Sequence, residues 1–530
     1  MHGITMLCMV MPFFALVSGV FSPASEHWLY VRDHMLPGYL LETVTLTLGA
    51  GVTAFVLGVV LAWCVSMYDF PGRKIFDVLL ILPLAIPPYI AAYAYEGLMG
   101  YTGAVQSVFR NSFGVSLHRI TTDIPAMAWG VWIFAITLFP YVYLLSRAFL
   151  QNQSAAVFEN ARLLGGGELR VFRLVGLPLL WPAATAGTIL VCLEVLNDFG
   201  VTSYYGLTTF TTAIFSAWFG MGDADTAVKL SLILLALVFF ALVARKAVHN
   251  ARRYHIVSSK EKRMFPCRVS GRAQTGIVLL CCPVCVAGFT APLCQMLYWL
   301  NLTWHGAFTG DLYRALAYTL GSAGAATLLV MVAAICTVNA NRLFGGKIFP
   351  LLSQGAILGY AVPSAVLAMG AITLFVGLDK CLAVMPIALA PLAASGSMLI
   401  YAYAVRFFSI GHHATEAGFA KIGMVYTEAS RTLGRSVTRT FFLVDLPLVR
   451  HALFSGAVLV FMDILKELPL GLLLRPFNTE TLGTWTYHFA NNEVLEETAL
   501  PSLCIILAGA IFILITRFLE NREARHVSRY

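Results

Sequence analysis

The sequence predicts an all-α polytopic membrane protein with about twelve transmembrane helices. Of its 530 residues, 59% are hydrophobic and only 12% are charged, whereas a soluble domain has about 25% charged residues. Apolar runs of roughly 20 residues, the length that crosses a bilayer as a helix, recur along the whole chain. A transmembrane β-barrel would instead show short strands of alternating polarity. The composition therefore favours a bundle of membrane-spanning helices.

The apolar runs define the candidate spans. In chain order these are residues 4–22, 40–67, 75–99, 124–149, 179–198, 227–245, 275–299, 313–337, 348–377, 382–406, 448–469 and 499–518. No lysine or arginine precedes the first run, and a cleaved signal peptide has a basic region there, so we favour a retained first span. Cys281, Cys282 and Cys285 fall inside one run and are interpreted as small buried side chains.

The basic residues predict the orientation of the spans. Most of the 35 lysines and arginines fall in alternate connecting segments and in the C-terminal tail. The positive-inside rule places these segments and both termini in the cytoplasm. The same placement explains the net charge of +8 without a nucleic-acid partner. The basic stretch 251–274 is interpreted as a solvated linker held near anionic membrane lipid.

One polar signature occurs twice in the chain. Residues 159–178 read ENARLLGGGELRVFRLVGLP, and residues 428–447 read EASRTLGRSVTRTFFLVDLP. Both fit the pattern E-x-[AS]-x3-G-x9-V-x-L-P, and corresponding residues are separated by a constant number of positions. Each half of the chain holds six predicted spans, and an even number gives both halves the same orientation. The halves are therefore predicted to be parallel repeats.

This repeat predicts the domain organisation. The first lobe covers residues 1–250 and carries its signature in the loop 150–178. The second lobe covers residues 275–530 and carries its signature in the loop 408–447. The basic segment 251–274 joins the two lobes.

Each signature predicts a short surface helix that ends at a glycine. Gly165 follows the first helix and Gly434 follows the second, and glycine readily takes the left-handed backbone that ends a helix. A second helix then runs toward Pro178 or Pro447, near the start of the next span, where proline is tolerated. Two charged loops of one design in so apolar a chain indicate two docking sites for two copies of one soluble partner.

Two pairs of carboxylates follow the signatures at matching positions. The i, i+4 spacing of Glu194 with Asp198, and of Asp463 with Glu467, predicts that each pair shares a helix face near the outer end of its span. Acidic groups in a membrane mark a transport pathway or an ion pair, and four carboxylates around one cavity would attract a hard cation. Docking of an external binding protein, plain solvation and neutralisation of Asp463 by Lys466 stay open as alternatives.

The remaining motifs argue against catalysis. His412 and His413 are expected in a solvated cytoplasmic loop, where two adjacent histidines do not by themselves make a metal site. The sequence contains no G-x-x-x-x-G-K-[ST] phosphate loop. It also contains no segment that groups a nucleophile, a base and an orienting residue. We therefore expect a transport subunit without catalytic residues, and its energy source on a separate subunit.

The signatures resemble the EAA loops of binding-protein-dependent ABC importer permeases. In that family the loop forms a coupling helix that lies in a groove of the ATPase subunit. Asn160 and Ser430 depart mildly from the family pattern. By position, the resemblance assigns the docking role to Glu159, Ala161, Gly165, Pro178, Glu428, Ala429, Gly434 and Pro447.

The resemblance also implies the partners and the location. It implies the type I importer permease fold, with two copies of a cytoplasmic ABC ATPase and a periplasmic or lipid-anchored substrate-binding protein. ATP and Mg²⁺ would bind to the ATPase, and this chain would hold no cofactor. The implied location is the bacterial inner membrane, in contact with lipid and not with nucleic acid.

Three longer segments narrow the resemblance. Residues 69–95, 194–218 and 463–487 are similar to fused two-lobe permeases of the ferric-iron uptake type, a match that covers nearly the whole chain. It implies translocation of ferric iron by alternating access. Permeases for thiamine, phosphonate, sulfate or polyamines share the loops and stay as alternatives. A secondary transporter driven by an ion gradient is a further alternative, although it would not need two matched docking loops.

Overall fold

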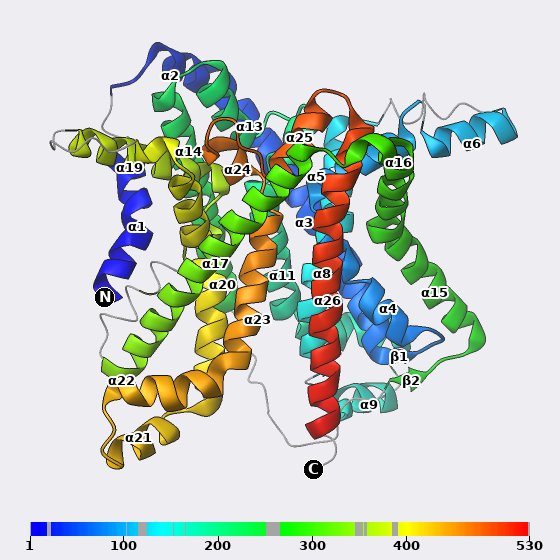
Figure 1. Ribbon diagram of the computed structural model, residues 1–530. Coiled ribbons are helices and arrows are strands. Elements are labelled where there is room, and N and C mark those ends of the chain that lie inside the picture. The colour runs from blue at the N-terminus through cyan, green and yellow to red at the C-terminus, as the bar shows by residue number, and fades with distance from the viewer. Residues whose placement is uncertain are drawn as a thin grey trace. The chain divides into compact units, whose positions relative to one another are not determined.

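A computed structural model describes residues 2–18, 23–101, 103–114, 124–151, 153–164, 166–250, 266–344, 353, 358–383 and 391–527. These residues are almost entirely helical (Figure 1). Two short strands, β1 (Tyr68–Asp69) and β2 (Cys267–Arg268), pair in parallel. The predicted all-α class is therefore confirmed.

The α-helices follow one another with short breaks. Those before the linker are α1 (His2–Ser18), α2 (Glu26–Tyr30), α3 (Leu36–Met67), α4 (Arg73–Leu79), α5 (Pro88–Met99), α6 (Ala104–Phe113), α8 (Ala126–Gln151), α9 (Ala155–Leu163), α10 (Glu168–Val171), α11 (Leu177–Asn197), α12 (Gly200–Tyr204), α13 (Phe210–Phe215) and α14 (Ala224–Asn250). Those after it are α15 (Gly271–Cys285), α16 (Ala291–Ala307), α17 (Gly310–Phe344), α19 (Ser364–Leu382), α20 (Gly396–Ile422), α21 (Val425–Thr432), α22 (Val437–Thr440), α23 (Leu446–Leu465), α24 (Pro469–Leu474), α25 (Leu482–Asn491) and α26 (Ala499–Val527).

Short helices of other types complete the chain. The 3-10 segments are η3 (Leu82–Ala85), η7 (Leu358–Ala361), η8 (Leu392–Ala394) and η10 (Leu495–Thr498). The π-helical segments are η2 (Val31–Met35), η4 (Phe172–Gly176), η5 (Ser216–Gly220), η6 (Val286–Thr290) and η9 (Phe441–Asp445).

Nine helices in the described part of the chain are long and apolar enough to cross a membrane. A tenth is counted if the bent pair Arg73–Ala85 and Pro88–Ser112 forms one span. Nine of the twelve predicted spans have a counterpart among the nine helices. The predicted spans 4–22, 75–99 and 382–406 are the three that do not.

The first of these three spans is only partly described. Helix α1 covers His2–Ser18, and residues 19–22 of the predicted span lie outside the described residues. The helix packs against α19, where the Pro12 carbonyl lies beside Gly370. The segment 75–99 bends by 97° between α4 and α5, where Pro83, Pro87 and Pro88 interrupt the helix.

Residues 384–390 of the predicted span 382–406 lie outside the described residues, and its predicted end is wrong, because α20 continues to Ile422. The Asp379 carboxylate accepts the backbone N–H groups of Leu392 and Ala393, at 2.8 and 2.9 Å, and so favours a turn before α20. Ser395 then caps the helix, which begins at Gly396 and runs to Ile422. Arg406 is therefore in the middle of a helix and not at its end. For the predicted span 348–377, the described helix α19 begins at Ser364, and most of residues 348–357 lie outside the described residues.

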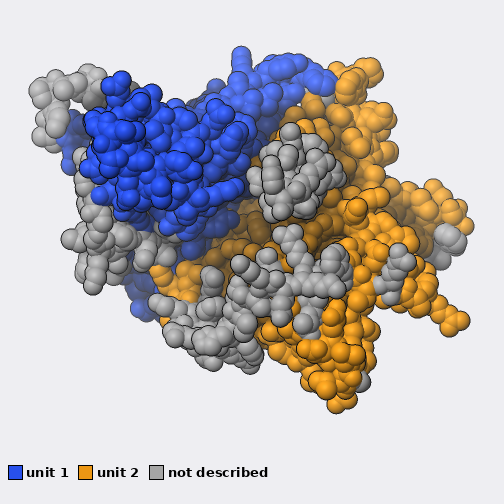
Figure 2. All heavy atoms as spheres, turned by 90° about the horizontal axis from the view of Figure 1, so that it is seen from below, with its two compact units in different colours: residues 1–34, 213–236, 308–485 blue, residues 35–212, 237–307, 486–530 orange. Residues whose placement is uncertain are grey.

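The chain packs as two compact units that each combine segments from both halves of the sequence (Figure 2). The first unit contains residues 1–34, 213–236 and 308–485, and the second contains residues 35–212, 237–307 and 486–530. Membrane helices associate by side-chain packing, whatever their order in the chain. The predicted lobes 1–250 and 275–530 correspond to the two copies of the duplicated sequence. The packed units differ from these lobes, because each unit contains segments from both copies.

Small residues allow close packing at the centre of each unit. Helices α3, α8 and α11 pack together in the second unit, as do α17, α20 and α23 in the first. A Cβ atom added at Gly187 in α11 would lie 2.6 Å from the Cα atom of Val142 in α8. At the matching Gly456 in α23, it would lie 2.6 Å from the Cβ atom of Ala414. Small residues at such contacts are typical of membrane helices.

Proline residues explain most of the π-helical turns. The segments η2, η4, η6 and η9 each end two residues before a proline, and these are Pro37, Pro178, Pro292 and Pro447. Proline donates no N–H, and its ring clashes with the carbonyl four residues earlier. A wider π turn accommodates the ring, and the helix continues. The structure therefore has uninterrupted helices over 168–197 and 437–465, both of which begin before the predicted spans.

We expect Gly187→Leu to destabilise the fold. The added side chain would meet the backbone of α8, which cannot give way as a flexible side chain could. Overpacking of this kind costs about 1–3 kcal/mol, so the thermal unfolding midpoint of the purified protein should fall.

Gly276→Leu is the matched control, because a Cβ atom at Gly276 in α15 meets nothing within 4 Å. Equal midpoints for the two variants would contradict the close approach of α8 and α11.

Candidate functional site

The two signature loops form the helices α9 and α21, each attached to the protein by one face. In α9, Phe158 is buried and packs edge-on against Trp63, with ring centroids 5.6 Å apart. In α21, Thr427 and Ser430 are buried. The opposite faces are exposed at matching positions, where Glu159 corresponds to Glu428 and Leu164 to Leu433. The two leucines are 89% and 82% exposed, which is unusual for such large apolar side chains.

Polar contacts fix the first loop. The Arg162 guanidinium forms an ion pair with Glu168 at 3.0 Å and also donates to the Cys267 thiol in β2. The Tyr68 hydroxyl in β1 donates to the Glu168 carboxylate at 2.9 Å. Burial raises the pKa of Tyr68 to about 12, so it stays a donor at neutral pH. The short β1–β2 pair and the loop thus form one connected network.

A different network fixes the second loop. The Arg342 guanidinium donates to the Gly423 carbonyl at 3.0 Å and to the Thr427 hydroxyl at 3.3 Å. Thr427 in turn donates to the buried Asp445 carboxylate at 2.7 Å. The Ser430 and Thr440 hydroxyls form a hydrogen bond across the turn, at 3.0 Å. Both loops are held firmly, although by different residues.

The predicted helix ends are present where the structure describes them. Gly434 has a φ of +81°, the left-handed backbone that favours glycine. The N–H of Arg435 then donates to the Ser430 carbonyl, and the N–H of Gly166 makes the equivalent bond to the Ala161 carbonyl. Gly165 itself lies outside the described residues.

The other predicted docking residues lie along the loops. Ala161 is half-buried in α9, and Ala429 is exposed in α21. Pro178 and Pro447 lie in the first turns of α11 and α23, where each follows a π turn. The docking role of these residues stays a prediction.

The acidic pairs do not share a continuous helix face, so that expectation is wrong. Helix α11 ends at Asn197 and helix α23 ends at Leu465, between the two members of each pair. Glu194 and Asp463 remain in the helices, whereas Asp198 and Glu467 lie in the breaks that follow. The i, i+4 spacing could not reveal these breaks.

Asp198 and Glu467 instead cap the short helices after the breaks. The Asp198 carboxylate accepts the N–H of Val201 in α12 at 2.8 Å. The Glu467 carboxylate accepts the N–H of Leu470 in α24 at a longer 3.5 Å. A carboxylate at a helix N-terminus satisfies free N–H groups and complements the helix dipole. The two halves therefore repeat one local design, a helix break held by an acid.

Glu467 also has a buried arginine partner. The Arg406 guanidinium in α20 lies 3.3 Å from the Glu467 carboxylate, and both side chains are less than 10% exposed. Arg406 also donates to the Val362 carbonyl at 2.8 Å. The Ser364 hydroxyl makes a short hydrogen bond to Glu467. Asp463 forms a longer ion pair with Lys466, at 3.9 Å. Neutralisation of Asp463 by Lys466 was one of the alternatives that the sequence left open.

Arg406 and a second cluster were not expected from the sequence. Arg406 is the last residue of the predicted span 382–406, although a lone arginine in an apolar run indicates a buried partner. In the second unit, the Asp77 carboxylate accepts the Tyr143 hydroxyl at 2.8 Å and pairs with Arg147 at 2.5 Å. Asp77 lies in the predicted span 75–99, and an acidic residue in an apolar run could have indicated this cluster.

The chain matches one protein family twice. Residues 54–254 and 329–529 each match the family described as "binding-protein-dependent transport system inner membrane component". These ranges contain both signature loops and both acidic pairs, so the family match follows the predicted duplication.

Individual relatives match over different lengths. The Fe(3+)-transport system permease protein FbpB 2 of Haemophilus influenzae is 22% identical over 490 residues, which cover 91% of this chain and 90% of that protein. The molybdenum transport system permease protein ModB of Escherichia coli is 29% identical, over 35% of this chain and 81% of its own. The sulfate transport system permease protein CysT of Salmonella typhimurium is 28% identical, over 37% of this chain and 68% of its own.

We expect Arg406→Met to destabilise the protein strongly. The substitution leaves the Glu467 carboxylate buried without a counter-charge, which costs about 3–5 kcal/mol. The double variant Arg406→Met/Glu467→Met should recover much of this loss. Thermal unfolding of the purified variants measures the effect.

Lys466→Met is the control, because its pair with Asp463 is more exposed and longer. An exposed pair contributes about 0–1 kcal/mol. A loss for Arg406→Met no larger than that of the control would contradict the buried ion pair.

Proposed function

Because this chain belongs to the family of binding-protein-dependent transport system inner membrane components, we propose that it forms the transmembrane pathway of an ATP-driven importer of ferric iron. The chain is a permease of the ABC importer class, a transport subunit of the membrane. The ATPase, the binding protein and the substrate are the parts of the proposal that go beyond the family.

Two copies of a cytoplasmic ABC ATPase dock on the signature loops, one on each. The main support is that α9 and α21 present the same exposed pattern of an acid and a leucine at matching positions. The exposed leucines would be covered by the ATPase, and Glu159 and Glu428 would lie beside them. ATP and Mg²⁺ bind to the ATPase and not to this chain.

Each loop connects to a long helix that ends at an acid-capped break. The helix over 168–197 leads from the first loop to Asp198, and the helix over 437–465 leads from the second to Glu467. A 30-residue helix spans about 45 Å, so a movement of the loop would be carried to the break. ATP binding drives alternating access only if the ATPase binds the two conformations with different affinity.

The substrate assignment rests on the extent of the match to the iron permease. That relative aligns with nearly the whole chain, whereas the molybdenum and sulfate permeases align with little more than a third of it. An acidic pathway is also consistent with a cation and not with an oxyanion. Glu194 and Asp198, at the end of α11, would attract a hard cation.

The binding protein delivers iron from outside, and the chain spans the bacterial inner membrane with both termini in the cytoplasm. The concentration of lysine and arginine in alternate connecting segments supports this orientation. In this orientation the signature loops lie in the cytoplasm, where the ATPase reaches them.

We expect Leu164→Asp and Leu433→Asp to weaken binding of the ATPase. Each places a charge where an apolar side chain would be covered by the partner. Loss of about 1.4 kcal/mol corresponds to a tenfold lower affinity, and the double variant should lose more. Co-purification of the ATPase with the tagged permease measures the effect.

Phe477→Asp is the control, because Phe477 is 98% exposed but lies between α24 and α25, away from α21 in the chain. Undiminished recovery of the ATPase with the double variant would reject the docking role.

We expect cells that lack this chain to lose ferric-iron uptake and to keep molybdate and sulfate uptake. Isotope uptake by the deletion strain and the complemented strain measures all three solutes. Unchanged iron uptake would reject the assignment, and loss of molybdate or sulfate uptake would replace it.

Asp198→Asn separates the charge of this residue from its capping role. Asparagine retains an oxygen that can accept the Val201 N–H but removes the negative charge. If the charge attracts iron, uptake should fall by about tenfold or more while the amount of folded protein stays the same. Asp311→Asn is the control, because Asp311 is exposed at the start of α17. Full uptake by Asp198→Asn would show that this residue only caps α12.

A further inference from the structure

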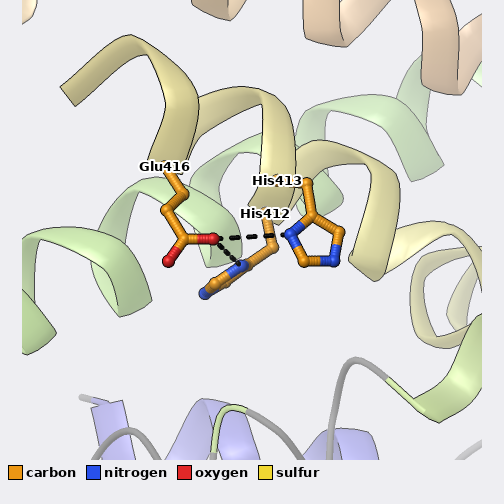
Figure 3. A group of neighbouring side chains, drawn as sticks. All are labelled: His412, His413 and Glu416. Atoms are coloured by element: carbon orange, nitrogen blue, oxygen red, sulfur yellow. Dashed lines mark hydrogen bonds and ion pairs between the residues drawn. The ribbon is translucent and has the colours of Figure 1, made fainter. Parts of the chain in front are cut away.

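Three side chains on α20 converge on one point. His412, His413 and Glu416 belong to this helix and not to the solvated loop expected from the sequence (Figure 3). The Nδ1 atoms of His412 and His413 lie 3.9 and 3.4 Å from the same oxygen of the Glu416 carboxylate. One ligand atom from each residue lies within 4.8 Å of the other two.

We propose that His412, His413 and Glu416 bind a divalent transition-metal ion, with water completing its coordination. Two imidazoles and one carboxylate are the ligands that Zn²⁺ and Fe²⁺ accept in proteins. A metal held at about 2.0–2.1 Å from each ligand atom needs those atoms roughly 3.4 Å apart in a tetrahedral site. The observed separations need only small rotations of the side chains.

The burial of the three residues suits a metal site that is open on one side. The His412 side chain is 4% exposed, whereas the His413 and Glu416 side chains are 60% and 59% exposed. The buried ring is held by packing and by its ring contact with Phe408, at 5.6 Å between centroids. The two exposed ligands leave room for an ion to enter and for water to coordinate it.

An ordinary histidine–glutamate pair does not account for this arrangement. Such a pair on a helix surface needs one histidine, three or four residues from the acid. Here a second imidazole, on a buried side chain, faces the same carboxylate oxygen. A cation between the rings and the carboxylate would satisfy all three groups together.

The matching helix of the other unit carries a cation at the corresponding place. Tyr143 and Arg147 in α8 occupy the positions that correspond to His412 and Glu416. In α8, the Arg147 guanidinium supplies a positive charge, which is paired with Asp77. In α20, the acid Glu416 takes the place of that arginine. A bound metal would place a positive charge at the position in α20 that corresponds to Arg147 in α8.

The position of the site on α20 connects it to the second signature loop. Glu416 lies six residues before the end of the helix at Ile422, about 9 Å along the axis. Helix α21 begins at Val425, directly after this end. A metal bound there would stabilise the C-terminal part of α20, directly before the second signature loop. The site does not depend on which solute the permease transports.

Metal binding by the full-length chain tests the proposal. The protein is purified in detergent with a tag that contains no histidine, stripped with a chelator and dialysed against Zn²⁺. We expect the wild type to bind about one Zn²⁺ with an affinity at least tenfold above that of Glu416→Gln and His413→Ala. Both substitutions are at exposed side chains, so the fold should be preserved. Bound Co²⁺ should also give a visible absorption spectrum that the variants lack.

His451→Ala is the matched control, because His451 is an exposed histidine in α23, away from the cluster in sequence. This variant should bind Zn²⁺ as the wild type does. Equal Zn²⁺ affinity of the wild type and the double variant His413→Ala/Glu416→Gln would overturn the proposal. So would a loss of binding in His451→Ala as large as that in the cluster variants.

Discussion

A helix inside a lipid bilayer has no water with which to hydrogen-bond, so every break in it must be satisfied by the protein itself. This constraint governs the two places where the repeated helices stop, after Asn197 and after Leu465. In each, a carboxylate turns back to accept the N–H groups of a following short helix. The acids that attract attention in the sequence are therefore part of the fold first. A role in transport would be added to this one.

Each signature loop is followed by one continuous helix that runs to a break. Pro178 and Pro447 each lack a backbone N–H donor and would clash with a preceding carbonyl, but a π turn accommodates each ring and the helix continues. Each loop is thereby joined to its break by a single rod. A network of side chains holds this helix at the loop, and a carboxylate holds the break at its other end. A movement of the loop would therefore be transmitted to the break.

The two halves have diverged where charge is buried. Both retain the carboxylate that caps the break, and the second half places Arg406 beside its own. The first half has a half-buried arginine elsewhere, in the cluster of Asp77, Tyr143 and Arg147. The corresponding positions of the second half carry His412 and Glu416. A duplicated fold thus keeps its packing glycines and its helix breaks while the ionic groups between helices change.

The sequence by itself determined the helical class, the duplication and the signature loops, because apolar runs and repeated motifs are properties of the chain order. It also located the acidic pairs, but not what they touch. Only the tertiary structure decided that Arg406 reaches Glu467, that α20 begins at Gly396, and that helices are exchanged between the packed units. These depend on contacts between residues far apart in the sequence. Hydropathy and spacing record the environment of a residue but not its partner, and in a membrane it is the partner that stabilises a buried charge.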